Sequence, residues 1–86
     1  MLNNLFKALS DPVRRKILNL LKEKSQTAGE ISSNFEVSDA TISHHLSILK
    51  ETGLVDREKK GTFIIYTLNT SLFEEAMNWL MDLKGE

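Results

Sequence analysis

The sequence predicts a mainly α-helical fold with one small β-hairpin, in a single domain over residues 1–86. Apolar residues recur with helical spacing through most of the chain, whereas residues 54–68 hold β-branched and aromatic residues beside a glycine turn. The chain has 86 residues and no cysteine, so its core is small and neither a disulfide nor a thiolate metal site can strengthen it. We therefore expect two copies of the chain to bury further apolar surface against each other.

Two helices are predicted at the start of the chain, over residues 2–9 and from Pro12 to about residue 23. Apolar residues of the first follow the i, i+3, i+4, i+7 spacing that places them on one face, namely Leu2, Leu5, Phe6 and Leu9. Asp11 can cap the second helix, and Pro12 suits its first position because proline lacks the N–H that a helix start leaves unpaired.

The next two predicted helices are separated by a three-residue turn. Thr27 and Glu30 form a capping box that opens a short helix ending near Phe35. Ser38 caps a longer helix, which ends at Gly53. The lengths of these helices and the tight turn between them are typical of a helix-turn-helix.

A β-hairpin is predicted to follow, over residues 54–68. Its strands cover residues 54–58 and 62–68, and Lys59-Lys60-Gly61 forms the turn, where Gly61 supplies a positive φ.

The last predicted helix covers residues 71–84, and Ser71 with Glu74 forms a second capping box at its start. The predicted order is thus four helices, two strands and one helix. A helix-turn-helix over residues 27–53 with a hairpin behind it is a winged helix-turn-helix, in which residues 54–68 are the wing.

The second helix of the helix-turn-helix has a polar face made of small side chains opposite its apolar face. Small polar side chains allow close approach to a DNA groove, where Ser, Thr and His can bond base edges or phosphates. We expect this face to contact DNA through Ser38, Asp39, Ala40, Thr41, Ser43, His44 and Ser47. The alternative is an ordinary solvated helix face.

The two adjacent histidines of this helix have different expected roles. Their side chains point about 100° apart, so they cannot hold one metal ion together. His44 faces outward, where we expect it to contact DNA. His45 lies beside the apolar face, where a half-buried histidine is the simpler interpretation.

Positive charge is concentrated on the body of the chain. Residues 1–70 carry a net charge of +2 and residues 71–86 a net charge of −3. In the wing we expect Arg57, Lys59 and Lys60 to reach a minor groove or the phosphates. The alternative is that these residues only protect a sheet edge from aggregation. The basic run at residues 14–16 fits a contact to the DNA backbone and a solvated helix start equally well.

The last helix has more apolar surface than one core can bury. Its apolar arc covers roughly 200°, whereas packing on one core takes about 100°. With the one-sided first helix it predicts an isologous homodimer interface made of Leu2, Leu5, Phe6, Leu9, Leu72, Phe73, Ala76, Met77, Trp79, Leu80, Met81 and Leu83. The alternative is that both helices only complete a monomer core. A dimer would place two reading helices about one DNA turn apart on a palindromic site.

A family resemblance is carried by DPVRRKIL at residues 11–18, by SDATISHHLSIL at residues 38–49 and by ETGLV at residues 51–55, followed by a wing that ends in Tyr66. These segments resemble the opening motif, the reading helix and the wing of the ArsR family of bacterial winged-helix repressors. The SHHL form and the short chain are most similar to the SdpR-type autorepressor subgroup. The resemblance implies a DNA-binding dimer whose repression is relieved by an inducer.

Many members of that family sense metals, but this sequence departs from their ligand motifs. The family's cysteine motif falls on residues 25–29, where Thr27 and Gly29 stand in the two cysteine positions. The last helix offers three carboxylates and no histidine, and carboxylates on a solvent face are weak, unselective ligands. We therefore expect no metal site and no cofactor. A small molecule, a protein partner or dilution would act as the inducer.

Other classes of function fit the sequence less well. A winged-helix protein–protein adaptor is the alternative, and it predicts an exposed apolar patch on the reading helix or the wing. We expect no enzyme, because the sequence has no Gly-rich phosphate loop and no nucleophile–base arrangement. Without a signal peptide or an apolar run of about 18 residues, we expect a cytoplasmic protein that does not insert into membranes and whose partner is double-stranded DNA.

Overall fold

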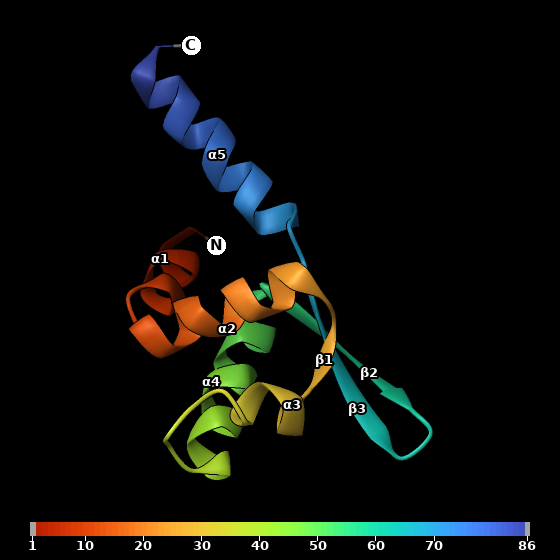
Figure 1. Ribbon diagram of the computed structural model, residues 1–86. Coiled ribbons are helices and arrows are strands. Elements are labelled where there is room, and N and C mark those ends of the chain that lie inside the picture. Colours follow the sequence, from red (N-terminus) through yellow and green to blue (C-terminus); the bar gives the residue numbers. More distant parts are fainter. Residues whose placement is uncertain (1, 86) are drawn as a thin grey trace.

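The computed structural model describes residues 2–85, which form five helices and a three-stranded sheet (Figure 1). The elements are, in chain order, α1 (Leu2–Leu9), α2 (Pro12–Glu23), β1 (Gln26–Thr27), α3 (Ala28–Ser32), α4 (Asp39–Thr52), β2 (Val55–Lys60), β3 (Phe63–Leu68) and α5 (Ser71–Lys84). Helices α1 to α4 gather into a body, from which the β2–β3 wing and α5 project toward opposite ends (Figure 1). The predicted mainly helical fold with a wing is confirmed.

Strand β1 is the one element missing from the predicted order, which lacked a strand between the second and third helices. It pairs antiparallel with β3 and makes the sheet order β1-β3-β2. Its Gln26 is buried, and the side-chain amide donates to the Leu20 carbonyl at 2.9 Å. A two-residue strand is too short to show an alternating pattern, so the sequence carries no signal for it.

The hydrophobic core lies where α1 to α4 meet the start of β2. Its fully buried large side chains are Leu5, Ile17, Ile31, Ile42, Leu46, Leu49, Leu54 and Val55. Helix α5 adds the buried Ala76, and all its residues after Ala76 are exposed as the helix extends away from the body (Figure 1). Within residues 2–85 no helix is long and apolar enough to cross a membrane.

Most of the predicted helix caps are confirmed. The Asp11 carboxylate accepts the first two N–H groups of α2, at 2.8 and 3.1 Å. Thr27 and Glu30 form both bonds of the capping box, at 3.2 and 3.0 Å. The Ser38 hydroxyl accepts a backbone N–H of α4 at 3.1 Å, and Gly53 ends that helix with φ +90°.

Helix α3 is shorter than predicted: it ends at Ser32 and not near Phe35. The Asn34 side chain donates to the carbonyls of Glu30 and Ile31, at 3.0 and 3.4 Å. Such side-chain bonds to local backbone groups compete with continuation of a helix. Phe35 therefore lies in the turn, half-buried against the core.

The predicted capping box of Ser71 and Glu74 is wrong. Ser71 is the first residue of α5, its N-cap is Thr70, and Thr70 makes no side-chain bond to the helix. The Asn69 side chain accepts the Ser71 N–H at 3.0 Å instead. An Asx turn thus replaces the expected box.

The hairpin turn is also displaced from its predicted place. Lys60 pairs with Phe63, so both lysines that were expected in the turn belong to β2. The turn is Gly61-Thr62, and Gly61 has φ +62° as two-residue hairpins require.

Candidate nucleic-acid interface

Helix α4 is amphipathic in the sense that the sequence predicts. Its core side is formed by buried Ile42, Leu46 and Leu49, and His45 beside them is half-buried. The predicted DNA-contacting residues of this helix and its cap are all exposed: Ser38, Asp39, Ala40, Thr41, Ser43, His44 and Ser47. We call this set the reading face. Its exposure and its small polar composition leave room for a nucleic-acid groove, while contact with DNA stays a prediction.

The start of α4 is fixed by polar contacts that involve members of the reading face. The Ser32 hydroxyl of α3 donates to the Asp39 carboxylate at 2.5 Å. The Ser38 hydroxyl lies 2.9 Å from that of Thr41. Asp39 therefore links α3 to α4, whereas the side chains of Ser43, His44 and Ser47 have no hydrogen bond within residues 2–85.

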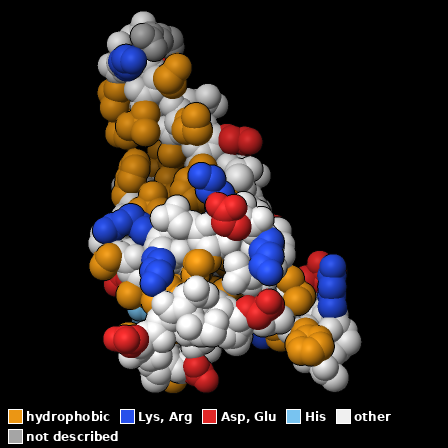
Figure 2. All heavy atoms as spheres, in the orientation of Figure 1, with side chains coloured by type: hydrophobic (Ala, Val, Ile, Leu, Met, Phe, Trp, Pro, Cys, Tyr) orange, Lys and Arg blue, Asp and Glu red, His pale blue; other side chains and the backbone are white. Residues whose placement is uncertain are grey.

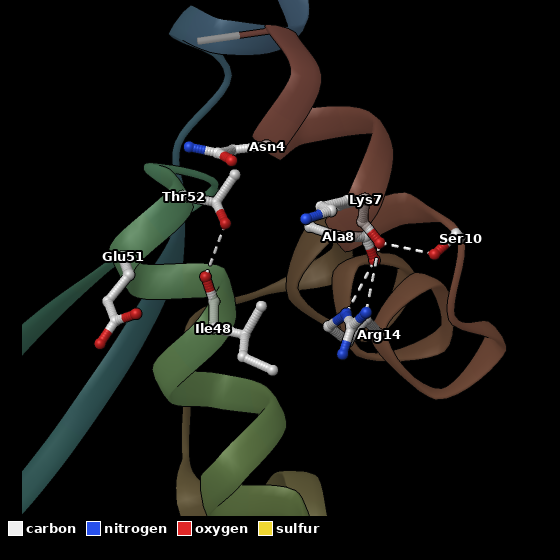
Figure 3. A pocket seen from close by; sticks show the side chains of 8 residues that line it. All are labelled: Asn4, Lys7, Ala8, Ser10, Arg14, Ile48, Glu51 and Thr52. Atoms are coloured by element: carbon white, nitrogen blue, oxygen red, sulfur yellow. Dashed lines mark hydrogen bonds between the residues drawn. The ribbon is translucent and has the colours of Figure 1, made fainter.

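Arg14 of α2 contacts both α1 and α4, and Figure 3 shows its two hydrogen bonds to α1. Its Nε donates to the Ala8 carbonyl at 2.8 Å, and its Nη2 donates to the Lys7 carbonyl at 3.2 Å. Its Nη1 lies 3.2 Å from Nδ1 of His45. Because a guanidinium only donates, Nδ1 of His45 must be the acceptor in this contact. The half-buried position expected for His45 thus has a specific purpose, which is to anchor the reading helix.

The three basic side chains at the start of α2 donate hydrogen bonds to backbone carbonyls of the same chain. Arg15 donates to the Leu9 carbonyl at 2.6 Å, and Lys16 donates to the Asn34 carbonyl at 3.0 Å. The Lys16 ammonium also lies 4.7 Å from the centre of the Phe35 ring. All three residues are thus bonded to backbone carbonyls of the chain, but Arg15 and Lys16 remain exposed, so a contact of this run with the DNA backbone stays a prediction.

The three predicted wing cations are all exposed, but they do not form one cluster. Arg57 pairs with Tyr66 and Lys59 with Ile64, so both lie on one face of the hairpin. Lys60 lies on the opposite face. Strand alternation therefore separates Lys60 from Arg57 and Lys59, and contact of these three residues with DNA stays a prediction.

A basic residue that the sequence did not single out joins the first two. Lys50 of α4 lines a cleft of about 320 Å³ with Arg57, Lys59 and Ile64. No periodic signal distinguishes it from other exposed lysines, since the cleft exists only once the wing folds beside α4.

The predicted dimer residues divide into three groups. Leu5 and Ala76 are buried in the chain's own core, so they have no surface to offer a second copy, and their assignment to the interface is corrected. Leu2, Leu9, Leu72 and Phe73 are half-buried against that core. The remaining six are 42% to 67% exposed: Phe6, Met77, Trp79, Leu80, Met81 and Leu83.

The exposed residues make a continuous apolar surface. Apolar side chains follow α5 along its length and meet the body at its base (Figure 2). There an apolar groove of about 640 Å³ runs between α1 and α5, lined among others by Phe6, Phe73, Met77 and Leu80. The Phe6 and Trp79 rings lie 5.9 Å apart between centroids, so α1 and α5 present one joint surface.

Comparison with known proteins agrees with this architecture. Residues 11–57 match the family model described as "Bacterial regulatory protein, arsR family". The chain belongs to the arsR family. It is 49% identical to the transcriptional repressor SdpR of Bacillus subtilis (strain 168) over 87 residues, which cover 99% of this chain and 97% of SdpR. It is 35% identical to the arsenical resistance operon repressor of the same strain, over 94% of this chain and 82% of that protein.

A solved structure of the family has the same fold. The ArsR-like transcriptional regulator from Rhodococcus sp. RHA1 superimposes with a TM-score of 0.92 at 31% identity, over 98% of this chain and 77% of that chain. The resemblance stated from the sequence, including that to the SdpR type, is confirmed. This arsR-family chain is a DNA-binding transcriptional repressor.

The arsR-family cysteine positions hold residues with other uses here. The Thr27 hydroxyl and the Glu30 carboxylate are bonded to each other's backbone in the capping box, and Gly29 has no side chain. Among residues 2–85 no three His, Cys, Asp or Glu side chains are grouped so that they could hold a metal ion. The expected lack of a metal site stays a prediction.

Proposed function

We propose that this repressor binds a palindromic operator as a homodimer, with α4 in the major groove and the wing against the DNA backbone. The observation that carries the proposal is the pairing of two surfaces on one small chain. The exposed, small and polar reading face suits a groove, and the exposed apolar surface of α1 and α5 suits a second copy.

The two surfaces lie at different ends of the molecule (Figure 1). A second copy packed on α1 and α5 would therefore leave both α4 helices free, as a two-fold symmetric operator requires. We propose Ser43, His44 and Ser47 as base-edge or phosphate contacts, with Arg57, Lys59 and Lys60 on phosphates.

We further infer that the repressor regulates its own gene in the cytoplasm, and that a small molecule or a protein partner relieves repression. Thr27 and Gly29 supply no sulfur ligand, so metal sensing through that motif is not part of the proposal. The support for this inference is the resemblance of the reading helix to the SdpR type, with 49% identity to the transcriptional repressor SdpR over 99% of this chain.

The test is a titration of the protein into labelled DNA from immediately upstream of its own gene, beside a scrambled duplex of equal length. Specific regulators prefer their site by about 10³ or more at about 150 mM salt. Ser43→Ala and His44→Ala should each reduce that preference, whereas Asn19→Ala, an exposed site on α2, should not. Equal binding of both duplexes by the parent protein would overturn self-regulation.

The adaptor alternative retains one supporting observation. It predicts an exposed apolar patch, and α4 shows none, but Phe63 on the wing is 62% exposed. An adaptor would bind neither duplex with preference, and Phe63→Ser rather than Ser43→Ala would remove its partner binding. The same titration therefore separates the two functions.

A further inference from the structure

The charged side chains of β2 are distributed unequally between the two faces of the strand. Successive residues of a strand point to opposite faces. Arg57 and Lys59 accordingly share one face, while Asp56 and Glu58 share the other with Lys60. One face of the wing is positive and carries no acid from β2, although the strand as a whole is nearly balanced.

Helix α4 adds a third cation to the positive face of the wing. Lys50, Arg57 and Lys59 line the same cleft of about 320 Å³ together with Ile64, and no carboxylate lines it. We call this the cationic cleft. Lys50 lies three residues after Ser47 and seven after Ser43, so it continues the same edge of the reading face by one helical turn.

The three cations of this cleft have no partner within residues 2–85. None of their side chains makes a hydrogen bond or an ion pair there, in contrast to Arg14, Arg15 and Lys16, whose side chains all donate to backbone carbonyls. Like charges gathered without a counter-charge disfavour the compact state, and a bound anion relieves that repulsion.

The position of the cationic cleft between α4 and the wing favours a phosphate of the DNA backbone as the bound anion. A single sugar–phosphate strand separates the major groove from the adjacent minor groove. A protein with a helix in one groove and a hairpin reaching the other must straddle that strand. The junction between α4 and the wing, where the cationic cleft lies, then faces phosphates and not base edges.

We propose that the cationic cleft binds one phosphate of the DNA backbone, with Lys50, Arg57 and Lys59 sharing it. This inference rests on the proposed placement of α4 and the wing, and it adds Lys50 to the binding surface. A shared phosphate fixes the register of the reading helix without contributing base preference.

The test is the salt dependence of DNA binding for Lys50→Gln, Lys59→Gln and the double variant. Each phosphate neutralised contributes about 0.9 to the slope of log K against log salt. Because the proposed dimer carries two cationic clefts, we expect each single variant to reduce the slope by up to about 1.8 and to weaken binding by up to about thirtyfold at about 150 mM salt. The loss should be equal on upstream and scrambled DNA. The double variant should lose no more than about 1.8 in total over the two clefts, because both lysines of a cleft serve the same phosphate.

Two controls accompany these variants. Lys84→Gln removes the same charge at the far end of α5, remote from the wing (Figure 1), and should leave the slope unchanged. Lys50→Arg keeps the charge and should keep the slope. Circular dichroism on each variant verifies folding.

Three outcomes would overturn the inference: an unchanged slope for Lys50→Gln, additive losses of about 3.6 for the double variant of the dimer, or a loss confined to upstream DNA. Failure of the proposed function is distinguishable from these. If the parent protein shows no operator preference but Lys50→Gln still lowers the slope on both duplexes, the phosphate site stands and the operator assignment falls.

Discussion

Asp11 shows how one side chain can define a helix start in this fold. Its carboxylate satisfies two of the N–H groups that begin α2, and removal of such a cap typically costs about 1 kcal/mol. We expect Asp11→Ala to lower the free energy of unfolding by about that amount in urea titrations. Asp11→Asn keeps an acceptor and should lose less. Equal losses in the two variants would contradict the capping role.

The same carboxyl should contribute to acid sensitivity. Burial raises the pKa of Asp11, but hydrogen bonds from the N–H groups of Arg14 and Val13 and the nearby positive charge of Arg14 outweigh it, so the pKa lies below its ordinary value of 3.8. The unfolded chain therefore binds this proton more tightly. The stabilisation is complete above the ordinary value and is lost as pH falls through the lower folded-state value.

The measurement for this effect is urea unfolding of the parent and Asp11→Asn at about pH 6 and about pH 3. The difference in stability between the two proteins should narrow at the lower pH, because only the parent loses a charge at position 11. A constant difference would show that the charge of Asp11 does not contribute.

At the scale of elements, Arg14 connects α1 with α4. Its guanidinium spans the Ala8 carbonyl and the His45 ring, which a lysine ammonium cannot reach in the same fork geometry. Loss of a hydrogen bond of this kind costs about 1 kcal/mol. We expect Arg14→Lys to reduce the preference for operator DNA by about fivefold while the protein stays dimeric.

The matched control is Arg15→Lys. Arg15 donates to the Leu9 carbonyl near the same helix start but makes no bond to α4. It should bind operator DNA like the parent protein. If both lysine variants bind like the parent, Arg14 does not position the reading helix.

The elements that the sequence predicts well are those with local signals. Asp11, Thr27 and Ser38 mark three helix starts correctly, since a cap bonds to N–H groups only two or three residues away. The predicted capping box at Ser71 is wrong because the Asn69 side chain accepts the Ser71 N–H, which the Glu74 side chain would accept in such a box. Local sequence rules thus identify the side chains that could accept a given N–H, but not which of them does so.

Features that depend on the assembled chain could not be predicted in the same way. The cationic cleft depends on the hairpin register, which puts Arg57 and Lys59 on one face of β2, whereas the sequence predicted Lys59 in the turn. The apolar arc of α5 was correctly seen as excessive for one core. Which part belongs to the chain's own core became clear only from the burial of Leu5 and Ala76.

At the scale of the whole molecule, the chain is elongated, with extents of 46 × 26 × 21 Å. The elongation follows from α5, whose exposed apolar residues extend beyond the body (Figure 1). A helix with Trp79, Leu80 and Leu83 in water gains apolar burial only when a second surface covers it. Dimerisation would therefore stabilise this small chain and at the same time set the spacing of its reading helices.

We expect Leu80→Glu to convert the dimer to a monomer, because a charge at this 51% exposed position of the groove would have to be desolvated in the interface. Sedimentation should give about twice the chain mass of 9.8 kDa for the parent and the single mass for the variant. Trp79 is the only tryptophan, so its emission should shift to longer wavelength when the dimer separates. Operator binding should fall steeply, since one reading helix contacts only one half-site.

Asn78→Glu is the control, because it introduces the same charge on a part of α5 that lies outside the apolar groove. It should sediment and bind DNA like the parent protein. A parent chain that sediments as a monomer at micromolar concentration would refute the dimer. A Leu80→Glu variant that stays dimeric would instead move the interface away from the groove between α1 and α5, and the spacing of the two α4 helices would then have to be set by another surface.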